Sequence, residues 1–195
     1  MTSLAKNKLI SIGIDVGTVN GAISIVDEDG NILVLTKAPC CQTEIKSKRN
    51  KSKLNKETGK YEVNFRKRNW VDFKKLKEIF KPYEKCKKIY TIERIQYRPN
   101  EGETSSFTNG NSLGIFQGLY VYLEPKLYLE PSAGEWKKEL GINALKETSI
   151  NLAQEIYKVN LKDYLRRGKV DDIAEALLLS FYGFKKYYER EKDGK

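Results

Sequence analysis

The chain of 195 residues contains no histidine, one methionine, five prolines and three cysteines. The absence of histidine excludes catalytic triads, cysteine–histidine pairs and histidine-ligated zinc sites. The cysteines, Cys40, Cys41 and Cys86, are odd in number and lack CxxC spacing. This pattern favours free thiols in a reducing compartment over a disulfide framework or a zinc site. We expect the cysteines to be small, buried, apolar residues.

Long hydrophobic runs are also missing. The longest early run, Leu9 to Ile14, is too short for a signal peptide or a membrane span. We therefore expect a soluble, cytoplasmic protein with no membrane partner that is not secreted.

Positive charge is abundant. The 36 lysines and arginines exceed the 26 aspartates and glutamates, which leaves a net charge of +10. A surplus of this size favours a polyanionic partner, most simply nucleic acid. If the protein is an enzyme, its acid chemistry must come from carboxylates, and we expect these to hold a hard metal ion.

The order of hydrophobic patterns predicts the fold. Residues 9–16 form a continuous β-branched run typical of a central strand, and two strands joined by a tight turn follow. A helical period then ends at Pro82. The expected strands are 9–16, 22–27, 32–37, 87–97 and 126–131, and the expected helices are 70–81, 105–124, 132–141, 144–158 and 170–188. This order predicts a single α/β domain over residues 1–195, with a mixed five-stranded sheet flanked by helices.

A basic insertion follows the third expected strand. Residues 43–68 hold ten basic residues against three acidic ones, a surplus of seven. ETGK is a plausible hairpin tip, and YEVNF alternates like a strand. The pattern predicts a basic arm or hairpin that projects from the core, and the alternative is a solvated loop without a function.

Glycines recur on one face of the helix expected at 105–124. Gly110, Gly114 and Gly118 each cost about 1 kcal/mol of helix propensity relative to alanine. We expect another backbone, or a dimer partner, to approach this face closely.

Four carboxylates are candidates for a metal site. Asp15 and Glu93 end two apolar strands, at the sheet edge where sites form in open α/β sheets. Asp172 and Glu175 are three residues apart on the last expected helix and so share a face. Asp171, four residues before Glu175, is an alternative to Asp172. Together these side chains could hold one or two Mg²⁺ ions, which would activate a water for phosphodiester cleavage.

Each of these carboxylates also has a structural explanation. Asp171 or Asp172 alone could cap the helix or interact with its dipole. Asp15 could cap the turn that follows it, and Glu93 could form a surface ion pair with Arg94. The combination of positions, rather than any single residue, favours the metal site.

The sequence resembles the RuvC-type Holliday junction resolvases of the RNase H-like superfamily, and it looks closest to their viral and bacteriophage members. Four segments carry the resemblance in the order of the family: ISIGIDVGTVNGAISIVD, TIERIQYRPNEGETSSFTNGNSLGIFQGL, LEPSAGEWKKELG and VDDIAEALLLSFYG. They span most of the chain outside residues 40–85. The family places its glutamate on the fourth strand, as Glu93 is placed here.

The resemblance implies a site and an assembly. Asp15, Glu93, Asp172 and Glu175 would bind two Mg²⁺ ions, with Mn²⁺ able to substitute and no small-molecule cofactor needed. Lys137 and Lys146 match lysines that lie near the scissile phosphate. The helix with the glycine face resembles the one that forms the family homodimer, and a two-fold dimer suits a symmetric four-way junction.

The sequence departs from the family pattern after Glu93. Bacterial members carry an aromatic residue three positions after this glutamate, whereas this chain has Gln96 followed by Tyr97. The last acid is Glu175, where aspartate is more usual. The residues expected to contact DNA are Lys46, Lys48, Arg49, Lys51, Lys53, Arg66, Lys67, Arg68, Gln96, Tyr97, Lys137 and Lys146.

The implied function is a Mg²⁺-dependent endodeoxyribonuclease. It would resolve Holliday junctions and other branched DNA in recombination and repair, in a bacterial cell or at a viral replication site. The alternatives are a non-catalytic nucleic-acid-binding module and a RuvC-like RNA-processing nuclease.

Overall fold

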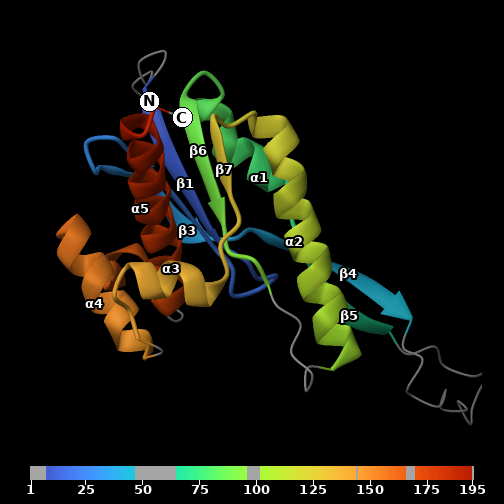
Figure 1. Cartoon of the computed structure of the whole chain (residues 1–195). Helices are drawn as coiled ribbons and strands as arrows, with labels where there is room; N and C mark the ends of the chain where they lie inside the picture. The colour runs from blue at the N-terminus through green and yellow to red at the C-terminus, as the bar shows by residue number, and fades with distance from the viewer. Residues whose placement is uncertain (1–7, 47–64, 96–101, 144, 166–169, 195) are drawn as a thin grey trace, which may run out of the picture.

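The computed structural model describes residues 8–46, 65–95, 102–143, 145–165 and 170–194. They form a five-stranded sheet in the order β3-β2-β1-β6-β7, a separate two-stranded ribbon and five α-helices (Figure 1). The strands of the sheet are β1 (Leu9–Asp15), β2 (Ala22–Asp27), β3 (Ile32–Lys37), β6 (Lys87–Ile92) and β7 (Leu127–Leu129). The ribbon pairs β4 (Cys40–Lys46) with β5 (Phe65–Val71). The helices are α1 (Phe73–Phe80), α2 (Glu103–Leu123), α3 (Ala133–Glu139), α4 (Lys146–Tyr157) and α5 (Asp171–Lys192).

The sheet is mixed, as the sequence predicts. β1 and β2 pair antiparallel, as do β2 and β3, whereas β6 runs parallel to both β1 and β7. Helices α1 and α2 cover one face, and α5 crosses the other face beside α3 and α4 (Figure 1). The expected mixed five-stranded α/β fold is therefore confirmed.

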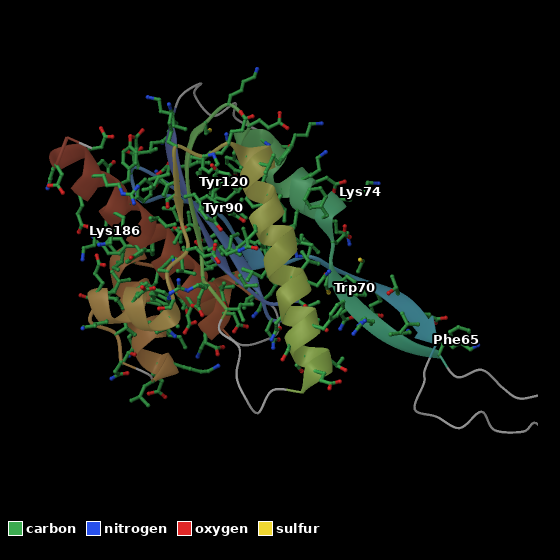
Figure 2. The ribbon with its side chains drawn as sticks, turned by 45° about the vertical axis from the view of Figure 1, so that its right-hand side comes forward. Phe65, Trp70, Lys74, Tyr90, Tyr120 and Lys186 are labelled. Carbon is green, nitrogen blue, oxygen red and sulfur yellow. The ribbon has the colours of Figure 1, made fainter. Side chains whose placement is uncertain are left out.

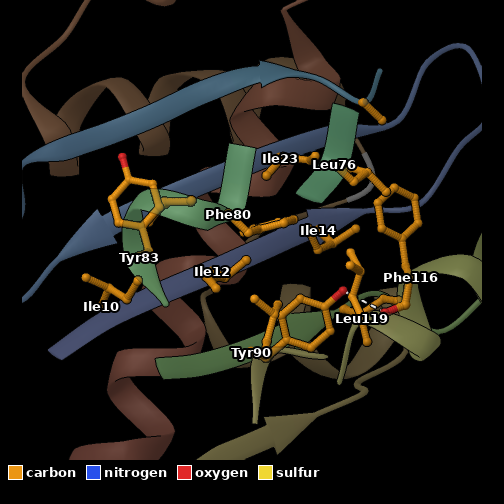
Figure 3. Packing of buried hydrophobic residues seen from close by; sticks show 14 of the residues in the cluster. Ile10, Ile12, Ile14, Ile23, Leu76, Phe80, Tyr83, Tyr90, Phe116 and Leu119 are labelled. Carbon is orange, nitrogen blue, oxygen red and sulfur yellow. Dashed lines mark hydrogen bonds between the residues drawn. The ribbon is translucent and has the colours of Figure 1, made fainter. Parts of the chain in front are cut away.

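The alternation of β1 assigns its side chains to two layers. Ile10, Ile12 and Ile14 are fully buried against α1 and α2, where Figure 3 shows them among aromatic and aliphatic side chains from these helices. Ser11 and Gly13 point to the opposite face, toward α5. One face of the strand is thus apolar, and the other is small and polar.

The small residues of β1 let α5 approach the sheet backbone. A Cβ atom on Gly13 would lie 2.1 Å from the carbonyl oxygen of Ala176, so only glycine fits there. Ser24 Oγ donates to the same carbonyl at 2.7 Å, and Ser11 Oγ donates to the carbonyl of Ser180 at 2.8 Å. These hydroxyls satisfy polar groups that are buried between the two layers.

The expected start of the first helix at residue 70 is wrong. Trp70 and Val71 were expected in a helix, but they end β5, where Trp70 pairs with Cys41. The helix begins at Phe73, because the Asp72 side chain caps it by accepting the Lys75 N–H at 3.1 Å. Pairing across the ribbon and this N-cap together override the helical period.

The expectation of buried cysteines holds only for Cys86. Cys40 and Cys41 are both exposed, because they lie on a two-stranded ribbon, outside the layers that cover the sheet. All three are free thiols.

The glycine face of α2 meets no other backbone within the described chain. A Cβ atom on Gly110, Gly114 or Gly118 would have no heavy atom within 4 Å among the described residues. The close approach expected at this face is therefore not made by any part of the chain that the structure describes. A dimer partner remains an expectation.

Replacing Gly13 by alanine should destabilise the protein by about 1–3 kcal/mol, because the added methyl group must displace the backbone of α5. Chemical unfolding of the purified variant measures this loss. The matched control is Gly134→Ala on α3, where the added methyl group meets open space. We expect the control to leave stability unchanged or raise it by up to about 1 kcal/mol. Equal stability of the two variants would contradict the close packing of α5 on β1.

Candidate active site

Two carboxylates meet at the ends of parallel strands. Asp15 is the last residue of β1, and Glu93 directly follows β6. The strands run in register, and the Glu93 N–H donates to the Ile14 carbonyl at 3.0 Å. Because side chains alternate along a strand, both carboxylates lie on the face that α5 covers.

The third carboxylate comes from α5. Glu175 precedes Ala176, whose backbone contacts Gly13, so the close packing of the helix also sets the position of Glu175 beside Asp15. Carboxylate oxygens of Asp15, Glu93 and Glu175 all lie within 4.8 Å of one another. The structure therefore brings together three of the four expected acidic residues from three separate elements.

The electrostatics of Asp15 reflect this crowding. Burial and the neighbouring carboxylates of Glu93, Glu175 and Asp172 hold the pKa of Asp15 well above its usual range, and Lys37 opposes them only in part. Removing a carboxylate from water and placing it beside like charges both favour the protonated form. A bound cation would reverse this preference.

The fourth acid lies outside the group of three. The carboxylate of Asp172 forms an ion pair with Lys37 at the end of β3. Asp171 is buried and forms an ion pair with Lys146 at the start of α4. Asp172 is close enough to Asp15 to raise the pKa of its carboxyl group.

Lys137 from α3 lies against the cluster. Its ammonium group contacts a Glu175 carboxylate oxygen at 2.7 Å. Asp171, Asp172 and Glu175 of α5 therefore each form an ion pair with a different lysine, and each lysine comes from a different element. The positive charges offset part of the repulsion that the acidic residues create.

Two further residues of the site were not anticipated from the sequence. Lys37 pairs with Ala22, which itself pairs with Asp15, so the hairpin register could have placed this lysine near the site. Trp136 is fully buried, and its indole N–H donates to Glu93 Oε2 at 3.0 Å. No local pattern of the sequence indicates that contact.

The structural explanations for the two strand-end acids receive no support. Arg94, the suggested partner of Glu93, forms its ion pair with Glu135 at 3.2 Å. Among the described residues, Asp15 accepts no hydrogen bond from the turn that follows it. Both carboxylates instead face the acidic cluster.

The expected DNA-contacting residues divide into two groups. Lys46 and Lys67 are exposed on the β4–β5 ribbon, Arg68 is half-buried, and Lys137 and Lys146 lie at the acidic site. Six other residues expected to contact DNA lie outside the described residues: Lys48, Arg49, Lys51, Lys53, Gln96 and Tyr97. The expected hairpin tip also lies outside them, as does the side chain of Arg66. The described flanks of the basic insertion do form an antiparallel ribbon, in agreement with an arm or hairpin.

Comparison with solved structures identifies the fold. The chain is similar to Thermus thermophilus RuvC in complex with a Holliday junction substrate, with a TM-score of 0.55 and 14% sequence identity over 93% of this chain and 96% of that one. A second Thermus thermophilus RuvC structure gives a TM-score of 0.50 at 14% identity over 94% and 96%. The expected RNase H-like fold is thereby confirmed. Both neighbours are bacterial, and neither bears on the expected likeness to viral members.

The other comparisons are negative. No protein-family model matches the chain, and no curated protein matches it. Among the described residues, no helix has both the length and the apolar character that crossing a membrane requires.

Replacing Asp15 by asparagine should stabilise the protein when divalent cations are absent. Because the pKa of Asp15 is raised in the folded state, the folded protein retains a proton that the unfolded chain loses near pH 4. The free energy of unfolding of the wild type therefore falls as the pH rises through the raised pKa. Asparagine cannot ionise, so the variant does not lose stability in this way. At about pH 7.5 in EDTA, we expect the melting temperature to rise by roughly 2–4 °C for each kcal/mol gained.

The matched control is Glu155→Gln at an exposed position on α4. A surface change of this kind should alter stability by no more than about 0.5 kcal/mol. A melting temperature for Asp15→Asn at or below that of the wild type would show that the acidic cluster is not under electrostatic strain.

Proposed function

We propose that this protein is a metal-dependent endodeoxyribonuclease that resolves four-way and other branched DNA. The observation that carries the proposal is the convergence of Asp15, Glu93 and Glu175 in a fold shared with RuvC. The acids reach one point from two parallel strand ends and one helix, at the sheet edge where α/β folds place their sites.

The donor set fits a hard divalent cation. All three side chains offer carboxylate oxygens, the ligands that Mg²⁺ prefers, and a bound cation would offset the burial and the like charges that raise the pKa of Asp15. If the ion pair between Asp172 and Lys37 opened, Asp172 would become a fourth carboxylate ligand. Four carboxylates would be enough to hold the two ions expected from the sequence. Bound Mg²⁺ would supply an activated water and neutralise the charge on the leaving oxygen.

The neighbouring residues would position the substrate and the ligands. Trp136 orients the carboxylate of Glu93 through its indole N–H. Lys137 lies beside Glu175, where its ammonium group can also contact a phosphate oxygen of the scissile strand. Lys146 pairs with Asp171 at the same end of α5 and extends this positive rim.

We further propose that the active form is a homodimer on branched DNA. A two-fold dimer presents two sites in related positions, as the two nicks in a symmetric junction require. The open glycine face of α2 and the exposed Val121 on the same helix offer a surface for a second copy. The similar Thermus thermophilus RuvC was solved with a Holliday junction substrate. Cys40 and Cys41 are free thiols, which are typical of proteins in the reducing interior of the cell.

Junction cleavage tests the proposal directly. A labelled synthetic four-way junction should receive paired symmetric nicks with Mg²⁺, or with Mn²⁺ in its place, and none in EDTA, while linear duplex of the same sequence stays intact. The cleavage rates of Asp15→Asn and Glu175→Gln should each fall by more than the roughly 10–100-fold that is typical when a residue that only supports the metal ligands is replaced. Both variants should still bind the junction, and Glu155→Gln should cut like the wild type.

Each other outcome would exclude a part of the proposal. Normal cutting by Asp15→Asn would exclude the acidic cluster as the metal site. Equal cutting of duplex and junction would retain the nuclease and exclude selectivity for branched DNA. Tight binding without cutting under any metal would favour the non-catalytic module, and cutting confined to RNA would favour the RNA-processing nuclease.

The contact between Trp136 and Glu93 gives an independent test of the metal site. Trp136→Phe removes the indole donor and keeps an aromatic ring in the buried position, so the affinity for Mg²⁺ should fall by about 10–100-fold. The shift of melting temperature with Mg²⁺ concentration measures this affinity without cleavage. An unchanged Mg²⁺ dependence would show that Glu93 does not ligate the ion.

A further inference from the structure

A groove begins at the loop that directly follows Asp15. One cavity of about 390 Å³ is lined by the loop that follows Asp15 and by the first turns of α2. A second cavity of about 200 Å³ adjoins it and extends to β5 of the ribbon. The two share the lining residues Thr18, Val19, Thr104 and Thr108, so they form one continuous groove.

Polar and positively charged side chains line the groove. Its walls carry hydroxyl and amide side chains, which can both donate and accept hydrogen bonds. At the ribbon end Lys67 and Arg68 add two positive charges, and none of the described residues that line the groove carries a carboxylate. This combination suits an occupant with a negative backbone and polar edges.

A stack of flat side chains forms at the ribbon end. The Arg68 guanidinium lies 5.0 Å from the ring centroid of Trp70 and 5.1 Å from that of Phe107 on α2. The indole N–H of Trp70 donates to Thr43 Oγ1 across the ribbon at 2.6 Å, which fixes the orientation of its ring. Figure 2 shows Trp70 at the end of the ribbon nearest to the body of the protein, with Phe65 at the far end.

The stack leaves a large aromatic surface open. Phe107 is 58% exposed, although phenylalanine side chains on a helix that packs against a sheet are usually buried. The contact with Arg68 explains how the ribbon is held against α2, but it does not account for this exposure. An exposed ring beside a guanidinium and a polar, cationic groove is the arrangement that binds the face of a nucleobase.

The position of the groove relates it to the acidic cluster. Val16 and Gly17 follow Asp15 without a break and line the groove, so its occupant lies close to the carboxylates. Thr18 and Ser112 are hydrogen-bonded through their side-chain oxygens, which ties this loop to α2. The walls of the groove are therefore held in place beside the site.

We propose that this groove binds an unpaired segment of a DNA single strand. A base stacks on the exposed ring of Phe107, which the Arg68 guanidinium holds in place, Lys67 contacts a phosphate, and the hydroxyls of Thr104 and Thr108 contact polar base edges. The inference rests on the proposed function for the origin of that strand, which is the opened region of a branched substrate. It assigns Phe107 and Lys67 a role in substrate binding near the metal site.

Binding of short single strands in EDTA tests this assignment without cleavage. Fluorescence anisotropy with a labelled thymidine oligonucleotide should show a dissociation constant for Phe107→Ala that is raised roughly 5- to 150-fold, the range for loss of one stacked base. The matched control is Phe73→Ala on α1, which removes a phenylalanine that is 43% exposed and outside the groove. This control should bind like the wild type.

A second oligonucleotide separates stacking from charge. A strand of abasic sites keeps the phosphates and lacks the bases, so Phe107→Ala and wild type should bind it equally. For the thymidine strand, Lys67→Ala should reduce the slope of log K against log salt by about 0.7, whereas Phe107→Ala should leave the slope unchanged. Arg68→Lys should keep the slope and still weaken binding, because an ammonium group lacks the flat face.

The outcomes distinguish this inference from the proposed function. Equal affinity of wild type and Phe107→Ala for the thymidine strand would overturn the inference, even if both proteins still cut the junction. So would a change in oligomeric state on Phe107→Ala, because it would assign the face to a second copy. Weakened strand binding in a protein that cuts no DNA would support the groove and contradict the nuclease. Unchanged melting temperatures show that the variants are folded.

Discussion

The site depends on the close contact between α5 and the backbone of β1. Gly13 leaves no side chain between them, and Ser24 satisfies the helix carbonyl of Ala176 that the contact buries. Glu175 precedes that carbonyl, and Asp15 follows Gly13 by two residues on the same face of the strand. A wider spacing between the layers would separate their carboxylates. The geometry of the acidic cluster therefore follows from the packing of a helix on a strand that carries no bulk at the point of contact.

Charge is the second constraint. Burial and the repulsion among the carboxylates gathered at this edge together raise the pKa of Asp15. The chain supplies three lysines against these acids, and each comes from a different element: Lys37, Lys137 and Lys146. A divalent cation would complete the balance. The cation would take over the contacts with the carboxylates, and the same lysines would then be free to contact the phosphates of the substrate.

The β4–β5 ribbon extends the site beyond the sheet. It is joined to α2 through Arg68, which lies between two aromatic rings, and the groove beside this stack leads toward the acidic cluster. Positive charge on a ribbon away from the core costs little, since the side chains stay hydrated. The two proposals would place the metal site on strands and a helix, and binding of a DNA strand on the neighbouring loop, ribbon and α2.

The sequence by itself determined which strand ends carry acids. Period-two burial and strand length are local properties, so Asp15, Glu93 and the acidic face of the last helix could be predicted without coordinates. Only the tertiary structure decided what each side chain meets. Asp172 faces Lys37, and Phe107 meets Arg68, through contacts between segments far apart in the chain. Such contacts depend on strand register and on the distance between layers, which are set by the packing of the whole fold and leave no periodic pattern in any one segment.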